Sequence, residues 1–267
     1  MTATIADSNL PVTRPAWDRS RLESRIVHLG CGAFHRAHQA LYTHHLLETS
    51  DSDWGICEVN LMPGNDRLLI ENLKNQQLLY TVAEKGADST ALKIIGSMKE
   101  ALHPEIDGCD GILRAMTRPQ TAIVSLTVTE KGYCTDAASG QLDLNNPLIK
   151  HDLANPGAPK SAIGYIVQAL HLRREQGLAA FTVMSCDNVR ENGHVAKVAV
   201  LGLAQARDPQ LAQWIEANAT FPCTMVDRIV PAATPETLQE IADQLGVYDP
   251  CAIACEPFRQ WVIEDNF

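Results

Sequence analysis

The stretch over residues 25–46, RIVHLGCGAFHRAHQALYTHHL, constrains most strongly how this chain can fold. It opens as a buried strand, turns at Gly30 and Gly32, and continues as an amphipathic helix. Glycines at such a turn let the backbone approach a pyrophosphate closely, with helix N–H groups beyond it. His35 stands where the G-x-G-x-x-G motif has glycine or alanine. The pattern therefore fits either a dinucleotide loop or a tight structural turn.

Apolar runs alternate with helical patterns along the rest of the chain, after an N-terminal arm that we expect over residues 1–24. Strands are expected near residues 26–30, 54–62, 121–133, 180–186, 223–232 and 251–267. Residues 78–102 are expected to pair as a local antiparallel or edge element, and residues 147–160 are turn-rich. The best-punctuated helix covers residues 234–246, with Thr234 as its cap. This alternation predicts an α/β fold with a doubly wound, mostly parallel sheet, which binds ligands at the carboxyl ends of its strands.

Charge and cysteine usage exclude several classes of protein. Lys and Arg total 22 against 32 Asp and Glu, a formal net charge of −10, which disfavours nucleic acid as a partner. No window approaches the roughly 18 apolar residues that a membrane helix needs, so no membrane partner is expected. Eight scattered cysteines are unlike the framework of a secreted scaffold. We expect reduced thiols in a cytoplasmic protein.

A carboxylate that binds ribose hydroxyls is expected near the end of the second strand. Residues 58–66, EVNLMPGND, offer Glu58 inside the strand and Asp66 at the start of the next helix. We favour Asp66, for which a helix cap is the alternative role. An acidic residue at this position would favour NAD over NADP, because it would repel the extra phosphate.

Residues 185–193, SCDNVRENG, follow another buried strand. That places Asp187, Asn188 and Asn192 at the sheet edge where ligands are expected, and an amide N–H there can stabilise the oxygen of a reacting carbon. Asn and Asp also commonly cap helices and build turns, so both interpretations stay open.

Two further groups of polar residues are weaker candidates. Asp227 and Arg228 lie in or at the end of an apolar run, where an ion pair or a functional role would offset the burial of charge. His35 and His38 invite a metal interpretation, but no Cys or carboxylate lies at a recognisable ligand spacing from them. We therefore predict no metal site.

Five motifs, in this order, resemble those of the mannitol dehydrogenase family, the polyol-specific long-chain dehydrogenases. They are GCGAFHRAHQ, SLTVTEKGY, FTVMSCDNVRENG, FPCTMVDRIVP and CEPFRQWVIEDNF, and the similarity covers residues 25–267. The family's fingerprint is G-x-G-x-F-x-R, which explains the missing third glycine and implies an NAD-binding, Rossmann-like domain over residues 25–267. The resemblance implies that the loop residues Gly30, Cys31, Gly32, Ala33, Phe34 and Arg36 bind the cofactor, with Thr127 near the nicotinamide. It also implies that Asn188 holds the reacting oxygen and that Val226 and Asp227 line the substrate pocket.

Within the family, the chain is most similar to bacterial members that interconvert D-fructuronate and D-mannonate with NADH. Family members run to nearly twice this length, with a helical C-terminal domain that carries a catalytic lysine. No lysine follows Lys197 here, so we expect that domain to be absent and the chain alone to be inactive. Two alternatives remain: a mannitol-type or arabinitol-type polyol dehydrogenase, and an NAD-binding fragment without catalysis.

Overall fold

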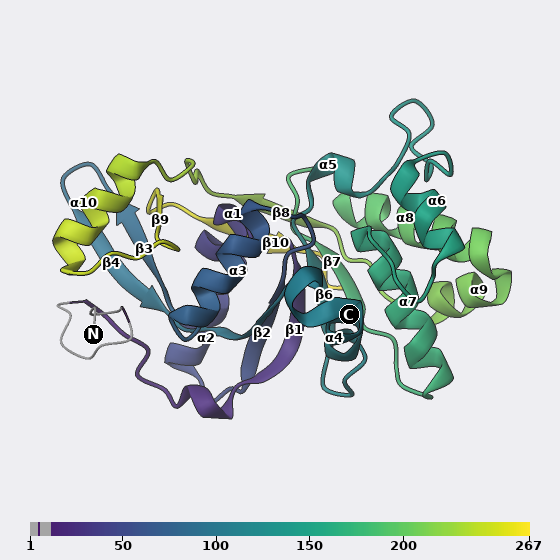
Figure 1. Cartoon of the computed structure of the whole chain (residues 1–267), viewed down its shortest axis with the longest axis horizontal. Coiled ribbons are helices and arrows are strands. Elements are labelled where there is room, and N and C mark those ends of the chain that lie inside the picture. The colour runs from purple at the N-terminus through teal and green to yellow at the C-terminus, as the bar shows by residue number, and fades with distance from the viewer. Residues whose placement is uncertain (1–4, 6–11) are drawn as a thin grey trace.

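The computed structural model describes Ile5 and residues 12–267 (Figure 1). The arm predicted for residues 1–24 therefore lies partly outside the described residues. Within its described part, a short 3-10 helix, η1 (Arg19–Arg21), leads directly into the first strand. That strand begins at Glu23, two residues before the expected domain start.

A five-stranded parallel sheet forms the centre of the molecule, as predicted. Its order is β5-β2-β1-β6-β7, with β1 (Glu23–Leu29), β2 (Trp54–Val59), β5 (Met98–Leu102), β6 (Ile123–Leu126) and β7 (Thr182–Ser185). The chain moves outward from β1 to β5 and then returns to the other side of β1. This reversal opens a crevice at the carboxyl ends of β1 and β6, where sheets of this type bind ligands.

Helices cover both faces of this sheet. Successive residues of a strand point to opposite faces, and apolar side chains on both faces need to be buried. Ile26 of β1 packs into one core and Val27 into the other. The core that includes Val27 is covered by α4 (Pro104–Met116), α6 (Pro147–Ala154), α7 (Ala162–Glu175), α8 (Asn192–Arg207) and α9 (Pro209–Asn218). The core that includes Ile26 is covered by α1 (Ala33–Ala37), α2 (Gln39–Thr49) and α3 (Asn65–Asn75).

Two smaller sheets extend the molecule beside α1 and α2 (Figure 1). The first contains β3 (Tyr80–Lys85), which pairs antiparallel with β4 (Thr90–Ile95), as predicted, and parallel with β9 (Ile253–Cys255). Helix α10 (Pro235–Leu245) packs on it, capped by Thr234 at its start and followed by Gly246 in the left-handed conformation. The second pairs β8 (Thr224–Asp227) antiparallel with β10 (Gln260–Ile263).

The structure departs from the expected elements in several places. Residues 129–132, expected inside a strand over 121–133, form the short helix α5 (Thr129–Gly132), and the strand expected over 251–267 is divided into β9 and β10, which belong to different sheets. Residues 147–154 form α6 instead of a turn, because Pro147 occupies the first helical position and the Asn146 side chain accepts a hydrogen bond from the Leu148 N–H. The helix after the glycine turn is divided into α1 and α2 at His38, whose backbone leaves the helical region. Residues 98–102 form an outer strand of the central sheet instead of joining the local antiparallel pair.

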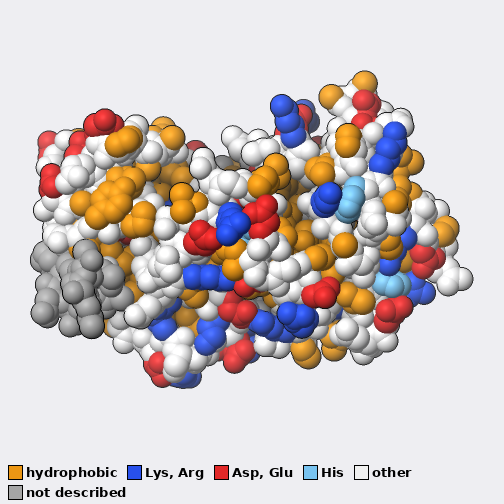
Figure 2. Space-filling view, viewed as in Figure 1, with side chains coloured by type: hydrophobic (Ala, Val, Ile, Leu, Met, Phe, Trp, Pro, Cys, Tyr) orange, Lys and Arg blue, Asp and Glu red, His pale blue; other side chains and the backbone are white. Residues whose placement is uncertain are grey.

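The surface charges and the state of the cysteines can be read from the structure. Figure 2 shows basic and acidic side chains interspersed on the face that it draws, with no broad basic area there. All eight cysteines lie in the described part of the chain, and none forms a disulfide. Among the described helices, none is both long enough and apolar enough to span a membrane.

Candidate functional site

The glycine turn after β1 lies directly against the end of β6. Gly30 adopts a φ of +109°, and a Cβ there would lie 2.2 Å from the Thr127 carbonyl oxygen. The Thr127 hydroxyl donates a 2.6 Å hydrogen bond to the Gly30 carbonyl. Gly32 is different, because its backbone is extended and a Cβ would meet nothing closer than 3.8 Å. Gly30 is therefore required by the fold, whereas Gly32 leaves open space beside the backbone.

Asn60, directly after β2, holds the glycine turn from the opposite side. Its side-chain oxygen accepts a 2.6 Å hydrogen bond from the Cys31 N–H, and the amide is buried. Sequence reasoning missed this residue, although it lies between the two carboxylates that were considered, Glu58 and Asp66. The signal was present: a polar side chain directly follows a buried strand in the sheet.

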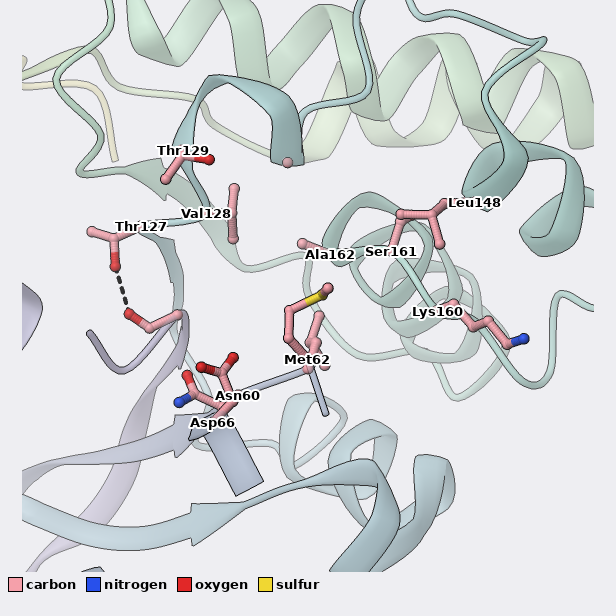
Figure 3. A pocket seen from close by; sticks show the side chains of 13 residues that line it. Asn60, Met62, Asp66, Thr127, Val128, Thr129, Leu148, Lys160, Ser161 and Ala162 are labelled. Carbon is pink, nitrogen blue, oxygen red and sulfur yellow. Dashed lines mark hydrogen bonds between the residues drawn. The ribbon is translucent and has the colours of Figure 1, made fainter. Parts of the chain in front are cut away.

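A cavity of about 210 Å³ opens at the crevice, between the glycine turn, the end of β2 and the loop after β6. Figure 3 shows Asn60 and Asp66 on one side of it and Val128 and Thr129 on the other. Burial raises the pKa of Asp66, which sits in the first turn of α3. The lining residues are Gly30, Asn60, Leu61, Met62, Asp66, Thr127, Val128, Thr129, Gly132, Leu148, Lys160, Ser161 and Ala162. Gly30, Asp66 and Thr127, all predicted cofactor residues, thus border one cavity.

The other predicted loop residues do not line this cavity. The Cys31 side chain is fully buried, and the partly buried Ala33 packs against the same core. The Arg36 guanidinium donates to the Cys251 carbonyl and lies over the Tyr80 ring at 5.8 Å. Phe34 packs with buried apolar residues at the ends of β7 and β8. The side chains of Cys31 and Arg36 therefore anchor the loop to the protein interior.

The residues predicted to hold the substrate lie beyond Phe34. Val226 is buried with Met184 and Cys186 in the cluster that Phe34 contacts. Asn188 is exposed and follows β7 at the same sheet edge as the glycine turn. Asp227 is exposed on β8. The glycine loop thus contacts Val226 through the packing of Phe34, whereas the side chains of Asn188 and Asp227 are accessible to solvent.

Asn192 builds the turn after β7. Its amide nitrogen donates to the Asp187 carbonyl at 3.0 Å and to the Thr224 hydroxyl at 3.0 Å. Its oxygen accepts from the Thr224 N–H at 2.8 Å. All of the amide's atoms are buried in these contacts, so Asn192 connects β7 to β8.

Arg228 is buried in a structural ion pair. Its guanidinium donates to the Glu84 carboxylate on β3, to the Ala37 carbonyl at 2.5 Å and to the Glu256 carbonyl. These contacts engage both terminal nitrogens of the guanidinium. The structure therefore supports the ion-pair interpretation of Arg228. Arg228 therefore connects α1 to the two small sheets.

A fully buried polar group lies beneath the glycine turn. His35 Nε2 is 2.8 Å from the Glu58 carboxyl, and the His28 ring stacks on His35 with centroids 3.4 Å apart. Burial holds the pKa of both histidines well below the usual range and raises the pKa of Glu58 to about 7. The histidines are therefore neutral, and the His35–Glu58 contact is a hydrogen bond instead of an ion pair. Glu58 is fully buried and is not among the residues that line the cavity.

The same three residues are close enough together to suggest a metal site. The two imidazole planes, however, are only 15° from parallel. Nitrogen lone pairs lie in the ring plane, so two stacked rings cannot both direct them at one ion. The geometry fits a hydrogen-bonded network, in which His28 also contacts Ser125 at 2.8 Å.

Comparison with known proteins decides the family. The profile of the family described as "Mannitol dehydrogenase Rossmann domain" matches residues 24–267. The chain belongs to the mannitol dehydrogenase family. The crevice, glycine turn and cavity described above are therefore those of a mannitol dehydrogenase Rossmann domain.

Curated relatives in the mannitol dehydrogenase family include the D-mannonate oxidoreductase of Escherichia coli (strain K12). It is 91% identical over 264 residues, which are 99% of this chain and 54% of the relative. A mannitol 2-dehydrogenase of Cereibacter sphaeroides is 46% identical over 96% of this chain and 53% of its own length. The chain thus spans about half the length of the curated relatives that it matches.

Solved structures of the family agree with the fold. The Pseudomonas fluorescens mannitol 2-dehydrogenase, in a ternary complex with NAD and D-mannitol, superposes with a TM-score of 0.94 at 41% identity. The match covers 99% of this chain and 55% of that one. A substrate-free D-sorbitol dehydrogenase gives a TM-score of 0.93 at 40% identity.

Proposed function

We propose that this chain is the NAD-binding portion of a fructuronate reductase, which interconverts D-fructuronate and D-mannonate by hydride transfer. The observation that carries the proposal is the cavity at the reversal of strand order, bordered by Gly30, Thr127 and Asp66. The 91% identity to a D-mannonate oxidoreductase supports the choice of substrate. We further propose that residues 25–267 form the cofactor domain, after an arm over residues 1–24.

The residues present fit a dinucleotide. Gly32 leaves room for a pyrophosphate against the backbone, since a Cβ there would occupy open space. Asp66 would accept hydrogen bonds from the ribose hydroxyls, and its negative charge favours NAD over NADP. Phe34 would support the loop from the substrate side through its packing on Val226. The bound nicotinamide supplies or receives the hydride.

Asn188 would hold the substrate oxygen. Its exposed amide can donate to the oxygen of the reacting carbon as negative charge develops there during reduction. Val226 and Asp227 would border the sugar acid. By the family resemblance the proton comes from a lysine, and no lysine follows Lys197 in this chain. The eight unpaired thiols favour a reducing compartment such as the cytoplasm for this activity.

The test is a titration of the chain with NADH, followed by nicotinamide fluorescence, with fructuronate then added to the same sample. We expect saturable binding without oxidation of NADH. D-Mannitol with NAD serves as the comparison substrate for the polyol alternative. Absence of NADH binding would contradict the proposal, and turnover would show that these residues suffice for catalysis.

A further inference from the structure

Asp187 lies where two strand ends border the candidate site. It follows β7 after one residue, and its side chain is buried. Its carboxylate accepts three hydrogen bonds from the loop after β6. The donors are the Val128 N–H at 3.1 Å, the Thr129 N–H at 2.9 Å and the Tyr133 hydroxyl at 2.7 Å. Asp187 therefore fixes the loop after β6 to the end of β7.

The segment that Asp187 fixes is a wall of the cavity. Val128 and Thr129 both line it (Figure 3). Thr129 adopts a φ of +64°, in the left-handed region. A β-branched residue is strongly disfavoured there, so the surrounding contacts must hold it in place. The two backbone hydrogen bonds to Asp187 supply that constraint.

Asp187 is itself held on the β7 side. Its N–H donates to the Ser185 hydroxyl at 3.3 Å, and its carbonyl accepts from the Asn192 amide at 3.0 Å. The next residue in the chain is Asn188, whose amide is proposed to hold the reacting oxygen. One buried carboxylate thus connects the cavity wall to the backbone that carries Asn188.

We propose that Asp187 is a positioning residue, which holds Val128 and Thr129 in register with Asn188 so that nicotinamide and substrate oxygen meet. This inference rests on the proposed function, because it assumes that the cavity receives the dinucleotide. Asp187 touches neither substrate nor cofactor in this role. It acts through the loop that it holds.

The first variant is Asp187→Asn, which keeps the size of the side chain but turns one accepting oxygen into an NH₂ group facing N–H or O–H donors. We expect the Kd for NADH to rise about tenfold or more, as the loss of a charge-assisted hydrogen bond predicts. The emission maximum of bound NADH should also shift, because the wall of its site moves. Both are measured well below the unfolding temperature, with folding checked by circular dichroism.

The matched control is Asp249→Asn, in the loop between α10 and β9. Asp249 is buried too, and it accepts from two backbone N–H groups, of Thr81 and Cys251, and from the Gln76 amide. None of these residues lines the cavity. Asp249→Asn should lower thermal stability, leave the emission of bound NADH unchanged and raise the NADH Kd by a smaller factor than Asp187→Asn, because Asp249 reaches the glycine turn only through Cys251, whose carbonyl accepts from Arg36. This separates a positioning effect from the general cost of removing a buried carboxylate.

A rescue experiment tests the link to Thr129. Glycine adopts the left-handed region without strain. Thr129→Gly should therefore recover part of the NADH affinity that Asp187→Asn loses, with Thr129→Gly alone as the reference protein for the double variant. If Asp187→Asn does not fold, Tyr133→Phe removes one of the three donors and should raise the Kd by a smaller factor.

The outcomes distinguish the two proposals. If the unaltered chain does not bind NADH, the proposed function fails and this inference fails with it. If the chain binds NADH and Asp187→Asn binds it equally well with the same emission, the positioning role alone is overturned. The same holds if Asp249→Asn weakens NADH binding as much as Asp187→Asn does.

Discussion

The side-chain oxygen of Asn60 accepts a hydrogen bond from the Cys31 N–H, with 2.6 Å between oxygen and nitrogen. The Asn60 N–H in turn donates to the Leu102 carbonyl at 3.2 Å. Hydrogen bonds of Asn60, at the end of β2, therefore connect the end of β5 to the glycine turn. The conformation of the turn depends on a residue that belongs to neither the glycine motif nor its helix.

Asn60→Ala should loosen this turn. The buried Cys31 N–H would lose its partner, at a cost of about 1–3 kcal/mol in the free energy of unfolding. NADH affinity should fall by about two- to tenfold if half of that cost is expressed in binding. Urea unfolding and a fluorescence titration measure the two effects. Asn145→Ala, on an exposed loop, is the control. Unchanged stability in Asn60→Ala would contradict this role.

The two glycines of the turn should respond differently to alanine. Gly30→Ala forces a Cβ against the Thr127 carbonyl at positive φ, so we expect a loss of about 1–3 kcal/mol in stability from backbone strain alone. Gly32→Ala should leave stability unchanged, because its Cβ meets open space. It should nevertheless abolish NADH binding if a pyrophosphate packs there. Tight NADH binding by Gly32→Ala would place the pyrophosphate elsewhere.

Glu58 should make stability depend on pH. Burial raises its pKa to about 7 in the folded chain, above its ordinary value of 4.5. The folded state then holds a proton that the unfolded chain releases, so this contribution to stability is complete below pH 4.5 and is lost as pH rises to about 7. The maximum slope is about 1.4 kcal/mol per pH unit.

Glu58→Gln removes this titration. His28 and His35, whose pKa values burial lowers, destabilise both proteins as pH falls below their ordinary value of 6.5, and the Glu58 charge has only a smaller, opposite effect on the pKa of His28. The measurement is therefore the difference in unfolding free energy between the two proteins across this pH range. A difference that does not change with pH would show that Glu58 titrates normally.

Arg228→Met should destabilise the chain strongly. The Arg228 side chain is fully buried against Glu84, and removal of one partner from such a pair costs about 3–5 kcal/mol. Arg228→Met combined with Glu84→Gln should be less harmful than the sum of the single changes. Chemical denaturation measures all three, with the exposed Arg190→Met as the control. Additive losses would show that the two side chains are not coupled.

The sequence predicted the parts of the fold that depend on local pattern. The alternation of strands and helices, the glycine turn and the capping of α10 all follow from neighbouring residues. The pairing of β9 with β3 could not be predicted, because short strands far apart in the chain carry no signal of their partners. Helix α6 was missed although Asn146 and Pro147 form an ordinary helix start.

The candidate site was predicted less completely than the fold. Gly30, Asp66 and Thr127 were expected at the cofactor and do border one cavity. Asn60 was not considered, and Asp187 was considered only as one of three polar residues in a turn. The roles of both depend on which N–H groups face them, and this becomes defined only when separate strand ends meet.

The hydrogen bond from Arg36 to the Cys251 carbonyl joins residues 215 positions apart. This separation affects the order in which the structure can form during synthesis on the ribosome. The last strand of the central sheet ends at Ser185, so that sheet can form before Cys251 is made. The hydrogen bond that anchors the glycine turn cannot form at that stage, because its acceptor, the Cys251 carbonyl, is translated later. A nascent chain can therefore form its parallel sheet first, and it can complete the anchoring of the glycine turn only after Cys251 has been made.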